Sequence, residues 1–260
     1  MLGSSVFAQA PKTPQAGAPT DLTGYWVAVI TEDWRFRMVT PPKGDYASIP
    51  LTADGRKAAD QWDRASDIAA GEQCRVFGAA GIMRMPLRLH VSWQDDSTLK
   101  MEIDNGDQVR LFHFDKSAQP PAQAGWQGFS AAEWETVGQG EELAPSGRPR
   151  PRNQAPSPPP LSGSLTGSLK VITTRMKPGY LRRNGVPYSA NARLTEFFDR
   201  TTGPHGESWL ILTSVVDDPL YLSEPLLLTT HYKLEADGSK FQPRPCEETA
   251  PVEGLAARPK

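Results

Sequence analysis

The sequence lacks three features that would point directly to a partner or a site: a long apolar run, a block of basic charge and a compact metal motif. No stretch approaches the roughly 18 consecutive apolar residues of a membrane-spanning helix, so no membrane span is predicted. The 28 basic and 30 acidic residues are mixed along the chain, which argues against nucleic acid as a partner. HExxH and CxxC motifs are absent, and we predict neither a metal nor another cofactor.

Cysteine is nearly absent, since the chain has only Cys74 and Cys246. An even pair so far apart in sequence favours a disulfide in an exported protein. If the pair is bonded, the chain-entropy model gives a stabilisation of about 5 kcal/mol as an upper figure. The alternative is two buried free thiols in a cytosolic protein.

The two ends of the chain and one internal segment are predicted to lie outside the folded part. Val6-Phe7-Ala8-Gln9-Ala10 has the small-x-small form of a signal-peptidase site, without a basic region before it. Residues 1–20 are therefore predicted to be a signal remnant and a disordered tether, and the protein to be periplasmic or secreted. The alternative is a disordered terminus without a targeting role. Residues 21–246 are predicted to be one β-barrel domain with a disordered proline-rich insertion at 138–161, and residues 247–260 a polar tail.

Proline and glycine are abundant, with 25 and 22 residues, and such frequent breaks favour many short strands over long helices. The clearest strands lie in residues 82–115. Leu87, Leu89, Val91 and Trp93 alternate with polar residues, and so do Leu99, Met101 and Ile103. The turn at 104–107 contains an Asn-Gly pair, which suits a type I′ hairpin.

Further alternating stretches bring the expected total to eight to ten strands. Trp34, Phe36 and Met38 predict a strand, and residues 53–64, after an N-cap at Thr52, predict the one short helix. Residues 78–81 are interpreted as a flexible turn. The predicted fold class is all-β, an antiparallel up-and-down barrel with one short helix.

Two sets of residues carry resemblances to known proteins. Gly24-x-Trp26 at the head of the first strand resembles the start of a calycin, or lipocalin-like, barrel, in which the Trp closes one end. Other segments resemble an exported bacterial family known only as hypothetical proteins. The resemblance covers most of residues 21–246 and implies export and a shared β fold, but no activity. These segments are Cys74-Arg75, Gly81-Ile82-Met83-Arg84-Met85-Pro86, Gly125-Trp126-Gln127-Gly128, Tyr188-Ser189-Ala190-Asn191, Leu194-Thr195-Glu196-Phe197-Phe198 and Asp217-Asp218-Pro219.

Several polar residues share a strand face with apolar neighbours. His113 follows Val109 and Leu111 in this alternation, and Arg175, Glu196 and Arg200 stand in similar positions. If these faces line a barrel, a cofactor-independent lyase or isomerase could use His113 and Glu196, with Tyr188, as acid/base groups. The alternative is structural: an ion pair of Glu196 with Arg200 and a hydrogen-bonded core histidine.

A metal site is a further alternative, because His90, His113 and His231 all fall on predicted strands. The first and third lie on polar faces and the second on an apolar one, so their positions disagree within one sheet. The residues proposed for ligand binding are aromatic side chains and two arginines from several segments, with plain core packing as the alternative. They are Trp26, Trp34, Phe36, Trp93, Trp126, Arg175, Tyr180 and Arg200.

Three functions follow from this pattern. The first is binding of a small apolar or aromatic molecule inside the barrel. The second is the lyase or isomerase chemistry on such a molecule, and the third is a structural envelope protein with a filled core. The sequence leaves the oligomeric state open.

Overall fold

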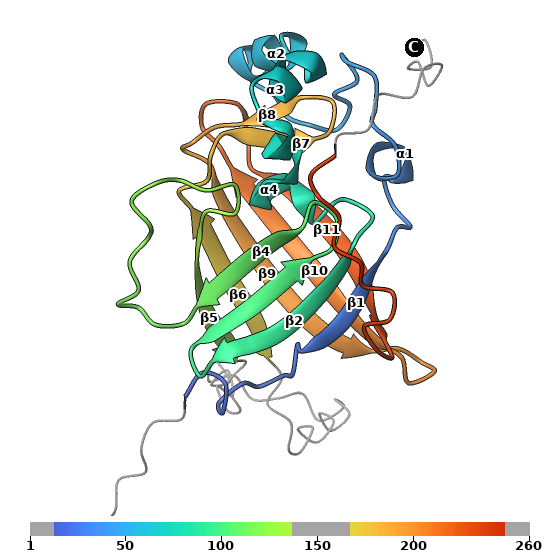
Figure 1. Ribbon diagram of the computed structural model, residues 1–260, viewed down its shortest axis with the longest axis vertical. Helices are drawn as coiled ribbons and strands as arrows, with labels where there is room; N and C mark the ends of the chain where they lie inside the picture. Colours follow the sequence, from blue (N-terminus) through green and yellow to red (C-terminus); the bar gives the residue numbers. More distant parts are fainter. Residues whose placement is uncertain (1–12, 137–166, 248–260) are drawn as a thin grey trace, which may run out of the picture.

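The computed structural model describes residues 13–136 and 167–247, and in this part of the chain nine strands close into a barrel (Figure 1). Around the barrel the order is β1-β11-β10-β9-β6-β5-β4-β3-β2. The barrel strands are β1 (Gly24–Val29), β2 (Arg88–Asp95), β3 (Thr98–Ile103), β4 (Gln108–His113), β5 (Phe129–Thr136), β6 (Gly167–Thr174), β9 (Arg193–Thr202), β10 (Ser208–Asp217) and β11 (Leu226–Glu235).

Neighbouring barrel strands follow one another along the chain, except that β7 (Gly179–Arg182) and β8 (Val186–Tyr188) leave the barrel as a separate hairpin. The all-β prediction is confirmed. An up-and-down barrel requires every neighbouring pair to be antiparallel, and β4 and β5 run parallel, with Phe112 opposite Ser130. The long loop 114–128 between them allows this, because a parallel pair needs a crossover connection.

The barrel interior is filled with large side chains. Leu89, Val91, Leu99, Met101 and Ile103 are all buried, as the alternation predicted. They belong to a continuous apolar cluster with Phe112, Leu169, Phe198 and Tyr232. The inward face therefore forms a packed core.

Strand β4 faces the opposite way from the prediction. Met101 lies opposite Arg110 and Leu99 opposite Phe112. Directly paired residues point to the same side of a sheet, so Arg110 and Phe112 face inward. Val109 is 48% exposed, and His113 lies on the outer face. The prediction failed because β4 carries apolar residues on both faces. When the alternation is shifted by one residue, the inward-facing and outward-facing residues change places.

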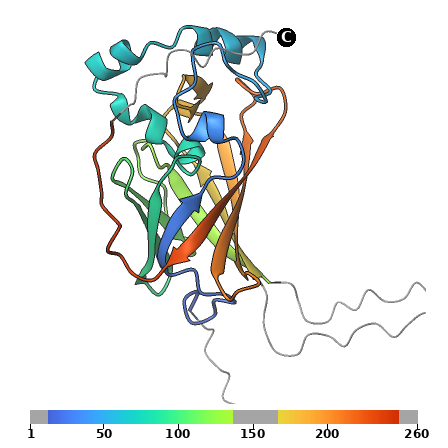
Figure 2. The same ribbon diagram turned by 90° about the vertical axis from the view of Figure 1, so that its right-hand side faces the viewer.

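Helices and the β7–β8 hairpin cover one end of the barrel, and we call this assembly the cap (Figures 1 and 2). Its helical elements are α2 (Ala53–Asp60), α3 (Arg64–Ala69), the 3-10 helix η1 (Gln73–Phe77) and α4 (Ala79–Ile82). The expected helix over 53–64 is thus shorter and is followed by a second one. Asp63 starts the second helix, because its carboxylate accepts the backbone N–H of Ala65 at 2.9 Å. The expected flexible turn at 78–81 instead contributes to the buried α4.

The strand predicted around Trp34 is wrong as well, because this segment forms the short helix α1 (Trp34–Arg37). Trp34 and Met38 are 60% and 51% exposed, whereas Arg37 is buried. Apolar alternation here therefore does not mark a buried sheet face.

The C-terminal segment 236–246, which we call the strap, leaves β11 and runs along the outside of the barrel to the cap (Figure 2). There Cys246 bonds to Cys74 of η1, closing a loop of 172 residues in sequence separation. The predicted disulfide is confirmed, and it is consistent with an exported protein. It ties the cap to the far end of the last barrel strand.

Parts of the predicted termini and insertion lie outside the described residues. The parts that lie outside are residues 1–12, the whole insertion 138–161 and the tail beyond Glu247. Residues 13–20, expected to be disordered, form a turn in which the N–H of Gln15 donates to the carbonyl of Asp96 at 3.1 Å. Within the described residues, no helix combines the length and apolar character needed to cross a membrane.

Candidate functional site

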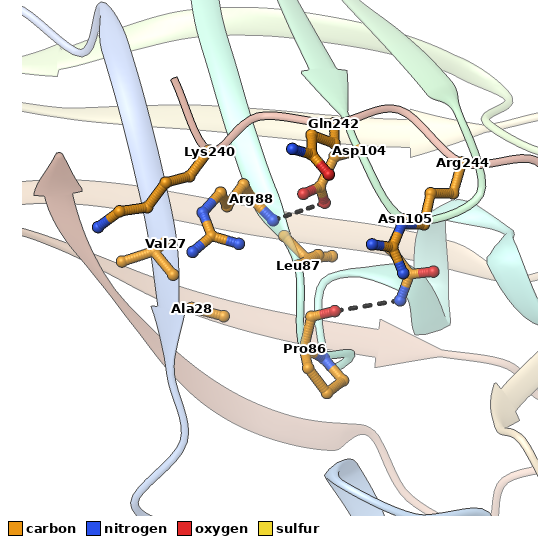
Figure 3. A pocket seen from close by; sticks show the side chains of 10 residues that line it. All are labelled: Val27, Ala28, Pro86, Leu87, Arg88, Asp104, Asn105, Lys240, Gln242 and Arg244. Carbon is orange, nitrogen blue, oxygen red and sulfur yellow. Dashed lines mark hydrogen bonds between the residues drawn. The ribbon is translucent and has the colours of Figure 1, made fainter. Parts of the chain in front are cut away.

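Two hollows of similar size differ in whether the polar groups around them have hydrogen-bond or ion-pair partners. The first, about 340 Å³, lies between the strap and strands β1 and β2 (Figure 3). Figure 3 shows its cationic side chains Arg88, Lys240 and Arg244 near Asp104. Both Arg88 and Lys240 are ion-paired with Glu235, at 2.9 and 3.4 Å.

The acidic group of this hollow also has a partner. Asp104 accepts the backbone N–H of Arg88 at 2.7 Å, and Asn105 donates to the carbonyl of Pro86 at 3.1 Å (Figure 3). These bonds hold the strap side of the barrel together. The hollow is therefore explained by structural contacts and does not need a ligand.

The second hollow, about 330 Å³, lies in the cap, and we call it the cap pocket. Segments far apart in sequence build it: the end of α2, helix α3, η1 and the β7–β8 hairpin. Four aromatic side chains and two prolines line it together with five polar or charged side chains. The aromatic residues and prolines are Trp62, Tyr180, Tyr188, Tyr221, Pro178 and Pro187, and the polar ones are Gln61, Asp63, Ser66, Asp67 and Arg75. Aromatic walls with a few polar groups are typical of sites for small organic molecules.

A hydrogen-bonded network forms one side of the cap pocket. The Tyr180 hydroxyl donates to Asp67 Oδ2 at 2.7 Å, and Arg75 donates to Asp67 Oδ1 at 2.9 Å. The Arg75 guanidinium also lies over the Tyr180 ring, 5.1 Å from its centroid. Burial alone would lower the pKa of Arg75, but the neighbouring Tyr180 and Asp67 raise it overall, so the guanidinium stays charged. The network fixes the position of the Tyr180 ring.

Tyr188 stands on the other side with a hydroxyl that has no hydrogen-bond partner among the described residues. The hydroxyl lies against Gly78 and Gly179, where an added Cβ would come within 2.0 and 2.5 Å of it. Only glycine permits such a close approach. Burial raises the pKa of Tyr188, against the opposing effect of the nearby Arg75 and Arg110 charges, so the phenol keeps its proton.

The indole nitrogen of Trp62 is the second orphaned polar atom in the pocket wall. Trp62 is 7% exposed, and its Nε1 is buried without an acceptor in the described part of the chain. A buried donor without a partner costs about 1–3 kcal/mol. An acceptor on a bound molecule would recover that free energy. Both unpartnered atoms thus belong to side chains that line the cap pocket.

Of the residues predicted from the sequence, the structure brings Tyr180 and Tyr188 together in this pocket. Sequence reasoning missed Trp62, Asp67 and Arg75. Trp62 falls within the predicted helix 53–64. Asp67 and Arg75 lie 113 and 105 positions before Tyr180, which both of them contact. The one usable signal was the Cys74-Arg75 pair, which the family resemblance already included.

The three residues proposed for acid/base catalysis are not brought together. Glu196 is fully buried inside the barrel, where both of its oxygens accept from Arg110, at 3.0 and 2.5 Å. His113 lies on the outer wall, stacked on Phe129 with ring centroids 5.1 Å apart. Only Tyr188 lies in the cap pocket. The structural alternative also needs correction, because the buried partner of Glu196 is Arg110 and not Arg200.

The other proposed ligand-binding residues lie in separate places. Trp26 is buried in the barrel, and the Arg200 guanidinium lies over its ring at 5.7 Å. Arg175, expected on the inward face, is exposed with a φ of 54°, and donates to the carbonyl of Ala122 at 2.9 Å. The left-handed backbone at Arg175 ends the alternation of β6 and turns its side chain outward.

Four aromatic residues of the same prediction lie outside the cap pocket. Trp34 is exposed on α1, and Phe36 packs beneath the Arg182 guanidinium at 4.0 Å. Trp93 packs against Phe114 with centroids 5.5 Å apart, and Trp126 lies 4.6 Å from Lys177 Nζ. These side chains line no common site.

The histidines do not assemble either. His90 is bonded to Glu102 at 2.8 Å, and His231 lies 3.5 Å from Glu32. Over the described ranges 13–136 and 167–247, no group of three or more His, Cys, Asp or Glu side chains is arranged to hold a metal ion.

Comparison with known proteins gave no matching family model, no matching curated protein and no matching solved structure. The structure itself defines the class: an all-β protein with a closed barrel, a helical cap over one end and a disulfide-bonded strap. The barrel is compatible with the calycin-like resemblance. The resemblance to the exported hypothetical family stays a prediction.

Proposed function

We propose that this protein binds a small aromatic molecule in the cap pocket. The observation that carries the proposal is a pair of buried polar atoms, Trp62 Nε1 and the Tyr188 hydroxyl, which have no partner among the described residues and belong to side chains that line the pocket. Aromatic side chains offer large apolar surfaces to a flat ligand, and the orphaned donors favour a ligand that carries a hydrogen-bond acceptor. The site thus differs from the barrel interior that the sequence suggested.

The two alternative functions have less support. Lyase or isomerase chemistry would need a base near Tyr188, and His113 and Glu196 lie elsewhere. A purely structural role agrees with the filled barrel, but it leaves the unpartnered atoms of the cap without a purpose. We further propose that the barrel is of calycin type and that the protein is periplasmic or secreted, since a disulfide persists in oxidising compartments.

Native mass spectrometry of the protein purified from its host, compared with the denatured spectrum, tests the proposal. A retained organic mass with an aromatic chromophore is expected.

A titration with a matched pair of probes gives an independent readout. Acetophenone and ethylbenzene have similar size, but only acetophenone has a carbonyl acceptor. Tryptophan fluorescence should report acetophenone binding with a Kd on the order of 1 mM or tighter, and clearly weaker binding of ethylbenzene. Absence of both a retained molecule and acetophenone binding would favour the structural role.

A further inference from the structure

The outer wall of three adjacent barrel strands has an area without charged side chains, and we call it the β9–β11 face. Leu227 is 64% exposed, more than any other large apolar residue that the structure describes. Directly paired residues point to the same side of a sheet, so the residues opposite Leu227 on β10 and β9 point outward with it. Two cross-strand rows make up the face: Thr195, Val215 and Leu227 in one, and Phe197, Thr213 and Thr229 in the other.

No described helix packs broadly on the β9–β11 face. The extensive contacts of β9, β10 and β11 are all with neighbouring barrel strands. The apolar and threonine side chains of the face therefore stay partly exposed over three strands. Charged or polar residues border it, with Lys170 of β6 directly opposite Phe197. An uncharged centre with a polar rim is typical of a protein interface.

The cross-strand row next to the face has an acid on one flank and an imidazole on the other. Asp199 of β9 and His231 of β11 both lie opposite Ile211 of β10. Asp199 accepts a hydrogen bond from a hydroxyl group on β6 but has no cationic partner within the described residues. His231 lies 3.5 Å from Glu32, and that carboxylate is already ion-paired with Arg37.

We infer that the β9–β11 face binds a second copy of this chain, related to the first by a twofold axis that runs along β10. This axis places β9 of each copy on β11 of the other, and β10 on β10. Asp199 then lies opposite the partner's His231, and this contact occurs twice. An imidazole N–H can donate to a carboxylate, so the flanking groups meet as donor and acceptor and not as two acids.

The side-chain sizes suit the same axis. Phe197 lies opposite the partner's Thr229, and Leu227 lies opposite the partner's Thr195, so each large side chain meets a small one. The outer wall of a barrel is convex, and two copies approach most closely along the central strand, where the face has only a threonine and a valine. The face belongs to the barrel wall, so this inference does not depend on the proposed function.

Analytical ultracentrifugation of the full chain over a range of concentrations tests the inference. Three strands give a small interface, so we expect a reversible dimer with a Kd on the order of 10 µM. A monomer even at millimolar concentration would overturn the inference and leave the face to a different partner.

A charge at the centre of the face locates the interface. Thr213 lies opposite the partner's Thr213, so Thr213→Arg brings two like charges together and should raise the Kd by about tenfold or more. The control is Val109→Arg, which adds the same charge on β4, on the opposite side of the barrel, and should leave the Kd nearly unchanged. Circular dichroism establishes that each variant is folded. Dissociation by Val109→Arg and not by Thr213→Arg would overturn the inference, because the dimer would then use the opposite wall.

An exchange of the two flanking groups tests the axis. Asp199→Lys alone removes the acceptor, and His231→Asp alone brings two acids together, so each should weaken the dimer. The two substitutions in one chain restore an opposite pair between the copies and should return the Kd close to that of the parent protein. Within one chain β10 separates the two positions, so this rescue requires a contact between copies. A double variant as weak as either single variant would overturn the proposed axis.

Discussion

The barrel interior and the cap pocket both contain buried polar groups, but these groups are hydrogen-bonded to different extents. Inside the barrel, the charges of Arg110 and Glu196 neutralise each other in a bidentate pair, and Thr173 accepts a further bond from Arg110 at 3.2 Å. Within the described residues, Arg110 Nε is the one nitrogen of this guanidinium without an acceptor. In the cap, Trp62 and Tyr188 each have a single polar side-chain atom, and neither atom has a hydrogen-bond partner within residues 13–136 and 167–247. The difference teaches that burial of a polar group does not identify a site. A group whose partner is missing is the more informative one.

The largest effect is expected from breaking the barrel pair. Glu196→Gln leaves the Arg110 charge buried without a counter-charge, and removal of one partner from such a pair costs about 3–5 kcal/mol. Urea unfolding should therefore show this loss. The double variant Arg110→Met with Glu196→Leu should recover most of it, since well-packed apolar residues replace buried ion pairs at little cost. If Glu196→Gln alone were as stable as the parent protein, the ion pair between Arg110 and Glu196 would not stabilise the barrel.

Alkaline pH should destabilise the protein through buried tyrosines, one in the cap pocket, one in the barrel and one in the segment before α2. Burial raises the pKa of Tyr188 in the cap and of Tyr232 in the barrel above the ordinary value of 10.0, and burial with a hydrogen bond to Asp60 raises that of Tyr46 to about 12. Above pH 10 the unfolded chain loses phenol protons that the folded protein keeps. The stabilising contribution is therefore complete below pH 10 and is lost as pH rises toward the folded pKa values, by about 1.4 kcal/mol per pH unit for each tyrosine.

Urea unfolding at pH 9, 10 and 11 measures this slope. The slope should be smaller in Tyr188→Phe than in the parent protein. An identical slope would mean that the Tyr188 hydroxyl ionises as readily in the folded as in the unfolded state.

Two tyrosines of the cap pocket should respond in opposite ways to the same substitution. Tyr180→Phe removes a hydrogen bond to Asp67 and should cost about 1–2 kcal/mol, because the carboxylate loses a buried donor. Tyr188→Phe removes a hydroxyl that has no partner in the described part of the chain, and it should leave the ligand-free protein equally stable or slightly more stable. Thermal unfolding of both variants without ligand makes the comparison. Equal destabilisation would imply that the Tyr188 hydroxyl has an acceptor.

The smallest effect is expected on the outer wall. His113→Ala removes a partly exposed ring stacked on Phe129, and its cost should stay within about 1 kcal/mol. Binding of acetophenone should not change. A loss of binding without loss of stability would return His113 to the site that the sequence predicted.

Local patterns predicted much of the barrel. The alternation of Leu89 and Val91 in β2 and of Leu99, Met101 and Ile103 in β3 gave the correct inward face, because those strands carry apolar residues on one side only. The even number and wide spacing of the cysteines favoured a disulfide over two free thiols, and the bond between Cys74 and Cys246 confirms it. The face of β4 could not be found in this way, since the partner of Arg110 is Glu196, 86 positions further along the chain.

The cap was harder to predict for the same reason. Its pocket combines short helices with a hairpin more than 100 positions later, as the bond between Asp67 and Tyr180 shows. Short helices leave little periodicity to detect, and the strand predicted over α1 is an example. Which polar atoms remain unpartnered depends on all of these contacts together, and no local pattern encodes it.

The most direct test of the central claim, that the cap and not the barrel binds the ligand, is calorimetric titration of acetophenone into two matched variants. Trp62→Phe keeps an aromatic ring in the cap wall but removes the indole N–H, and Met101→Leu makes a volume-conserving change inside the barrel. We predict that Trp62→Phe weakens binding several-fold, as expected for the loss of one hydrogen bond worth about 1 kcal/mol, and that Met101→Leu leaves it unchanged. The reverse pattern, with binding sensitive to Met101 and indifferent to Trp62, would contradict the account.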